Sequence, residues 1–336
     1  GAGMSPGFMQ LWSPQEARDF YDCIEWAGVQ AWSNGKVGLN GISYYAMNQW
    51  QVASLRPPHL AAICTWEGAA DMYRDLSHHG GILCDFIKNW YDMQVKTVQY
   101  GLGKRGPKSR VTGMPVCGDV NLSDAQLKAN REDFGGAALK HALDDEYWKS
   151  RMPDWSKVNV PILSAANWGG QGLHPRGNFE GFLRAASQEK WLEVHGGSHW
   201  APFYTDYGVG LQKKFFGYFL KGERTGWSTQ PRVLLQVHHP DRFVERRAVA
   251  DLDAASVGEN IVVALTPIEY RSSAGRGPFR VLASDGQRRG PGCPLGLVVG
   301  VGGLHVRVLD QPLRTELRPQ LINQHHPNLA ALHLPE

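Results

Sequence analysis

Cysteine is scarce in this chain, with five residues in 336 and no two of them spaced as Cys-x-x-C. The number is odd and the spacing is wide, which argues against a disulfide framework and against a cysteine-based zinc site. We therefore expect reduced, mostly buried thiols, as is typical of a cytoplasmic protein. The cysteines are Cys23, Cys64, Cys84, Cys117 and Cys293.

Long apolar runs and a strong net charge are also missing. No stretch of 18 apolar residues occurs, so no membrane-spanning helix is expected, and no signal peptide is visible. Charged residues make up 20% of the chain and the formal net charge is +3, which argues against nucleic acid or a membrane surface as partner. The chain begins with Gly1 rather than methionine, so we expect the natural protein to have residues before it.

The last third lacks two residue types that are common before it. All 12 tryptophans lie at or before Trp227, and no lysine follows Lys221. The stretches "PRVLLQV" and "GLVVGVGGLHVRVL" are typical of strands, whereas "RSSAGRGPFRVLASDGQRRGPGCPLG" has little periodicity. We separate residues 228–336 as a C-terminal region, for which a β domain and a poorly ordered tail both stay open.

The first part alternates helix and strand. Ser13-Pro14-Gln15-Glu16 is a capping box that predicts a helix from Pro14 to Ala27. A strand over residues 36–42, a helix over 44–55 and a strand over 60–66 are predicted next. Strand, helix and strand in this order imply a parallel pair with a right-handed crossover.

A mostly helical, loop-rich segment interrupts this alternation. The pattern then resumes with predicted strands over 158–168 and 190–195 and predicted helices over 175–186 and 209–220. The sequence thus predicts an α/β chain with a helical insertion between its strands. Its expected parts are residues 1–71, 72–155, 156–227 and 228–336.

The stretch "GLNGISYYAMNQW", residues 38–50, contains a candidate nucleophile. Ser43 stands between a predicted strand and a predicted helix, with Gly41 two positions before it and Ala46 three after, as a nucleophile elbow requires small neighbours. The glycine usual two positions after the serine is Tyr45 here. Ser43 as an ordinary helix N-cap therefore stays open beside the catalytic interpretation.

A candidate general base follows the last predicted strand of the core. "VHGGSHW" places His199 in a glycine-rich loop, where the α/β-hydrolase arrangement puts its histidine, after both the serine and the acid. His195 lies nearer the strand and is expected to be a packed or hydrogen-bonded side chain.

Several segments in this order resemble the serine hydrolases grouped with cocaine esterase and the X-Pro dipeptidyl-peptidases, the CocE/NonD type. They are "GKVGLNGISYYAMNQWQVAS", "WEGAADMYRD", "VPILSAANWGGQG", "GGSHW" and "KKFFGYFLKGE", and the similarity runs from Gly1 to about Arg247. The resemblance implies an α/β-hydrolase core with a helical cap and a jelly-roll domain after it. It also implies Ser43 as nucleophile, His199 as base and the backbone N–H of Tyr44 as an oxyanion donor.

The acid departs from the family pattern. The family places it in a Trp-x-Asp context, but Gly170 stands at that position here. Some α/β-hydrolases carry the acid at the end of the preceding core strand, where this chain has Glu67, with Asp71 one turn further on. We favour Glu67 over Asp71, and Glu67 as a plain loop or cap carboxylate stays open. The resemblance also implies that the first strands of the sheet, and a tyrosine that supplies a second oxyanion donor, precede Gly1.

The sequence therefore predicts a serine hydrolase that cleaves carboxylic ester or amide bonds, such as those of a small-molecule ester or a short peptide, without a cofactor. Two alternatives stay open: X-Pro dipeptidyl-peptidase activity, and a truncated chain without activity. Adjacent histidines such as His78-His79 lack metal-ligand spacing, so no metal site is expected. A homo-oligomer stays open as well, because the sequence does not decide the oligomeric state.

Overall fold

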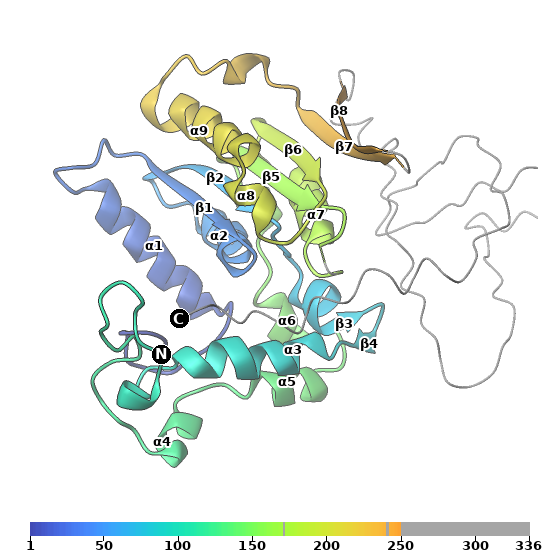
Figure 1. Ribbon diagram of the computed structural model, residues 1–336. Helices are drawn as coiled ribbons and strands as arrows, with labels where there is room; N and C mark the ends of the chain where they lie inside the picture. The colour runs from blue at the N-terminus through green and yellow to red at the C-terminus, as the bar shows by residue number, and fades with distance from the viewer. Residues whose placement is uncertain (171, 240–241, 250–336) are drawn as a thin grey trace, which may run out of the picture. The chain divides into compact units, whose positions relative to one another are not determined.

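The computed structural model describes residues 1–170, 172–239 and 242–249. Its centre is a six-stranded sheet in the order β1-β2-β5-β6-β7-β8, in which all neighbours are parallel except the antiparallel pair β7 and β8 (Figure 1). The strands are β1 (Val37–Ile42), β2 (Leu60–Trp66), β5 (Ile162–Asn167), β6 (Lys190–His195), β7 (Val233–His239) and β8 (Arg242–Val249). The α/β class predicted from the sequence is confirmed.

Alternating side chains of the strands enter two separate apolar cores. Leu39 and Ile63 face one core, shared with helices α1 (Pro14–Gly28) and α2 (Tyr44–Leu55). Cys64 and Leu163 face the other core, which is shared with α9 (Asp206–Lys221). The sheet therefore has helices on both faces, as parallel sheets require because both of their faces are apolar.

The predicted helical insertion between β2 and β5 consists of short elements. Two of them are π-helices, η1 (Met72–Ser77) and η2 (Tyr91–Val95), which the sequence did not predict. The others are β3 (His78–His79), β4 (Ile82–Leu83), α3 (Phe86–Trp90), η3 (Lys96–Val98), η4 (Gly103–Arg105), α4 (Asp124–Ala129), α5 (Phe134–Lys140), α6 (Glu146–Lys149) and η5 (Trp155–Lys157).

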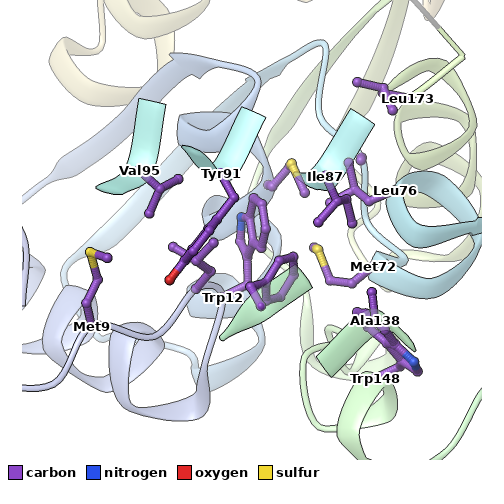
Figure 2. Close-up of a cluster of buried hydrophobic side chains, with 14 residues drawn as sticks. Met9, Trp12, Met72, Leu76, Ile87, Tyr91, Val95, Ala138, Trp148 and Leu173 are labelled. Atoms are coloured by element: carbon purple, nitrogen blue, oxygen red, sulfur yellow. The ribbon is translucent and has the colours of Figure 1, made fainter. Parts of the chain in front are cut away.

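A third apolar core holds this segment together and connects it to the N-terminus (Figure 2). Trp12 belongs to this core together with Tyr91 and Trp148, and Trp12 is 2% exposed. Burial of several large aromatic rings at about 1.5–3 kcal/mol each explains how such short helices keep their places.

The remaining elements follow the core strands in the chain. α7 (Pro175–Arg184) connects β5 to β6, and α8 (Ala201–Tyr204) precedes α9. After η6 (Trp227–Thr229), β7 pairs with β6 and continues the core sheet, whereas the sequence pattern assigns residues 228–336 to a separate C-terminal region. The expectations for residues 250–336, including the strand "GLVVGVGGLHVRVL", lie outside the described residues. No helix of the described part is long and apolar enough to cross a membrane.

Candidate active site

Ser43 occupies a strained turn between β1 and α2. Its backbone has φ 61° and ψ −116°, and its side chain makes no capping hydrogen bond to the helix. Ser43 thus stands at the N-cap position of α2 without capping it through the side chain, because a capping serine has extended backbone and its hydroxyl accepts a hydrogen bond from the first turn. A positive φ at a non-glycine residue costs about 1–3 kcal/mol and is typical of functional sites.

Small residues around Ser43 allow this turn. A Cβ atom on Gly41 would lie 2.4 Å from Cβ of Tyr45, so any larger residue would clash with the first turn of α2. Ala46 is fully buried, and a Cβ atom on Gly68 would lie 2.9 Å from its methyl group. Alanine therefore fits three positions after Ser43, because the facing residue in the loop after β2 is Gly68.

Glu67 and His199 meet at the same end of the sheet. Glu67 directly follows β2 with φ 51°, and His199 lies in the loop after β6. Oε2 of Glu67 accepts a hydrogen bond from Nδ1 of His199 at 2.6 Å. Asp71, the other candidate acid, is engaged elsewhere: it accepts bonds from the backbone N–H groups of Tyr73 and Arg74 and pairs with the Arg74 guanidinium at 2.7 Å.

The surroundings of Glu67 keep its carboxylate ionised. Burial alone would raise the pKa of Glu67, whose side chain is 0% exposed, but hydrogen bonds from His195, His199 and Asn167 outweigh it and lower the pKa to about 2. Asn167 donates from Nδ2 to Oε1 of Glu67 at 3.0 Å and also to the carbonyl oxygen of Gly197 at 3.1 Å. The end of β5 is thereby tied to both the acid and the loop of His199.

His195, expected to be a packed or hydrogen-bonded residue, lies under the site between two carboxylates. Its Nδ1 is 2.6 Å from Oε2 of Glu193 and its Nε2 is 3.4 Å from Oε1 of Glu67. Burial acts to lower the pKa of His195, but the bonds to the two carboxylates raise it to about 9. The ring is therefore an imidazolium at neutral pH, and both of its N–H groups donate.

The sequence did not indicate His174, which is the residue hydrogen-bonded to Ser43. Nε2 of His174 lies 3.1 Å from Oγ of Ser43, and the His174 ring is stacked on His199 with centroids 5.1 Å apart. Among the described residues no hydrogen bond joins Ser43 to His199. The only hint in the sequence was that His174 belongs to the loop after β5, where the family has its acid.

The backbone N–H of Tyr44 is at the first position of α2, where no helical carbonyl is available to it. This end of the helix also carries positive partial charge, so the group suits an oxyanion. The Tyr44 hydroxyl donates to Glu16 at 2.8 Å, and its ring stacks on Trp12 at 4.6 Å. Both contacts fix the residue that follows the serine.

A metal site is not formed by the described residues: no group of three or more histidine, cysteine, aspartate or glutamate side chains is arranged to hold an ion. His78 contacts the hydroxyl of Ser77 at 3.0 Å, and His79 contacts the carbonyl oxygen of Asp75 at 2.7 Å. These adjacent histidines thus have separate protein partners.

Comparison with known proteins identifies relatives of this chain. The sequence model of the X-Pro dipeptidyl-peptidase (S15) family matches residues 1–201. The cocaine esterase of Rhodococcus sp. (strain MB1 Bresler) is 41% identical over 143 residues, which are 41% of this chain and 22% of the esterase. The 1.95 Å crystal structure of a CocE/NonD family hydrolase from Staphylococcus aureus has 39% identity and a TM-score of 0.61, over 73% of this chain and 40% of that one. The chain therefore spans less than half the length of these relatives.

Proposed function

The chain belongs to the X-Pro dipeptidyl-peptidase (S15) family of CocE/NonD-type hydrolases, and on that premise we propose that it cleaves carboxylic ester or amide bonds through an acyl-enzyme on Ser43. One observation carries the proposal. The 2.6 Å bond between Glu67 and His199 lies at the sheet edge where the strained turn presents Ser43.

The first step is attack of Ser43 Oγ on the substrate carbonyl carbon. Because Nδ1 of His199 donates to Glu67, the neutral ring has its free lone pair on Nε2, which accepts the serine proton. Glu67 stabilises the imidazolium that forms, and the N–H of Tyr44 stabilises the oxyanion. The protonated His199 then gives its proton to the leaving group.

The second step is hydrolysis of the acyl-enzyme. His199 takes a proton from water, the hydroxide adds to the acyl carbon, and the bond from that carbon to Oγ breaks as Oγ regains a proton from His199. The contact between serine and histidine that both steps need commonly shortens only when substrate binds.

The substrate class that we propose first is a carboxylic ester, since the relative at 41% identity is named a cocaine esterase. An X-Pro peptide is the second candidate, because the family model carries that description. For either substrate, we propose that residues 72–155 act as the cap of the hydrolase.

A fluorophosphonate probe tests the proposal, because it reacts covalently only with an activated serine. The whole chain is incubated with the probe, and the adduct is located by peptide mass spectrometry beside a Ser43→Ala variant. Stoichiometric label on Ser43 is expected, followed by turnover of short-chain aryl esters. A folded chain that stays unlabelled would contradict the proposal.

A further inference from the structure

His174 connects the nucleophile to the loop that follows the acid. The residue is 4% exposed and directly precedes α7. Its Nε2 lies 3.1 Å from Oγ of Ser43, and its Nδ1 lies 3.2 Å from the backbone nitrogen of Ala69. Both ring nitrogens therefore have a partner within hydrogen-bond distance.

These two contacts fix the tautomer of His174. A backbone N–H can only donate, so Nδ1 of His174 accepts from Ala69 and carries no proton. The proton of the neutral ring is then on Nε2, which donates to Ser43 Oγ. Burial, followed by the neighbouring His199, lowers the pKa of His174 to about 3, so the ring stays neutral at physiological pH.

His174 cannot be the base in this arrangement, because the nitrogen that faces Ser43 already carries a proton. His199 has the opposite tautomer, with its proton on Nδ1 and a free lone pair on Nε2. The two stacked rings, with planes 8° apart, thus offer one donor and one acceptor. Ser43 Oγ can accept from His174 while its own hydrogen points to His199.

We propose that His174 is a further catalytic residue, a neutral hydrogen-bond donor to Ser43 Oγ. The assignment rests on the proposed function of Ser43. While His199 removes the serine proton, the His174 N–H stabilises the negative charge that develops on Oγ. In hydrolysis of the acyl-enzyme the same N–H stabilises Oγ as its bond to carbon breaks and the electron pair moves onto oxygen. The His174 proton itself is not transferred in either step.

The test compares His174→Phe with His174→Gln. Phenylalanine keeps a ring for stacking but has no donor, whereas glutamine has an amide N–H₂ near the position of Nε2. We expect His174→Phe to slow fluorophosphonate labelling of Ser43 by about 10- to 100-fold, as for loss of a hydrogen bond to a charged group. We expect the labelling rate of His174→Gln to remain within about fivefold of that of the natural chain. In ester turnover, the loss in His174→Phe should appear in kcat rather than in KM.

His78→Gln is a matched control. His78 is also 4% exposed and stacks on an aromatic ring, that of Tyr73 at 4.7 Å, but it bonds to Ser77 in the helical insertion. Its variant should label at the natural rate. Equal rates for His174→Phe and the natural chain, or faster labelling after loss of the donor, would overturn the proposal.

A second measurement separates this proposal from the proposed function. Nitrogen-15 spectra of histidine-labelled chain, assigned with His174→Gln, should show the His174 proton on Nε2 and no titration above about pH 4. A proton on Nδ1 would overturn the donor role. A natural chain that does not label would overturn the proposed function, and the spectra would still show whether His174 donates to Ser43.

Discussion

The guanidinium of Arg176 lies 2.9 Å from the carboxylate of Asp75, although the two residues stand 101 positions apart. The other oxygen of Asp75 accepts bonds from the backbone N–H groups of Ala70 and Asp71, both at 2.9 Å. Asp75 therefore joins the loop after Glu67 to the helix after His174.

Loss of this connection should destabilise the chain. Asp75 is 1% exposed, so Asp75→Ala leaves two backbone N–H groups without their acceptor and removes the nearest carboxylate from Arg176, whose other carboxylate partners lie at 3.6 and 3.8 Å. We expect the free energy of unfolding to fall by about 3–5 kcal/mol, as for a broken buried ion pair. Urea denaturation measures the loss. Lys149→Gln, which affects an exposed pair with Glu146 at 3.9 Å, is the control and should change stability by less than about 1 kcal/mol. Similar losses in the two variants would contradict the prediction.

Relief of backbone strain at Ser43 should stabilise the chain while it removes the proposed nucleophile. Ser43→Gly has no Cβ atom and adopts φ 61° without strain, whereas Ser43→Ala keeps the strain. We expect the glycine variant to unfold with a free energy about 1 kcal/mol higher than the alanine variant. Denaturant melts of the two variants measure this difference, and both should lack fluorophosphonate label. Identical stabilities would mean that the turn relaxes when the hydroxyl is lost.

Glu67 should be required for reactivity, and Asp71 should not. Glu67→Gln cannot stabilise the imidazolium of His199, and we expect the rate of labelling at Ser43 to fall by about 10³- to 10⁴-fold. Asp71→Asn removes a charge that pairs with Arg74 at 2.7 Å and should leave the labelling rate of the folded chain within about threefold. The inverse result would transfer the role of the acid to Asp71.

His195 should make stability depend on pH on the alkaline side. Its pKa is raised from 6.5 in the unfolded chain to about 9, so the folded chain binds the proton more tightly. The stabilisation is complete below about pH 6.5 and is lost as the pH rises toward 9, on the order of 3 kcal/mol at most. Unfolding free energies between pH 6 and 10 should fall for the natural chain and stay flatter for His195→Gln. A natural chain whose stability is constant over this range would contradict the assignment.

The sequence predicted the parts of the site that depend on order along the chain. A strand before Ser43, a strand before Glu67 and a strand before His199 can be read from short apolar runs, and parallel strands place their carboxyl ends at one edge. The strand over residues 60–66 was predicted with its observed ends. Periodicity is a local property of the sequence, and it is sufficient to predict these strands and their order along the chain.

His174 could not be predicted, because periodicity reports only local structure. Its contact with Ser43 depends on how the loop after β5 turns back toward β1, and the residues "GGQGLHP" contain no periodic signal. The π-helices η1 and η2 were missed as well, because their extra residue per turn follows from packing rather than from propensity. β6 and β7 are successive strands, but helices and loops over residues 196–232 separate them, and the apolar run of β7 would suit another sheet equally.

The arrangement of Glu67 and His199 provides a way to measure how many chains are natively assembled. These residues stand 132 positions apart, and the nucleophile comes from a third strand end, so none of them gains its partner until the sheet has formed. If Ser43 reacts as proposed, the fraction of labelled serine equals the fraction of chains in which these three strand ends are assembled. Titration with a covalent probe would give the fraction of natively assembled chains in any preparation, where circular dichroism would report only average helix and strand content.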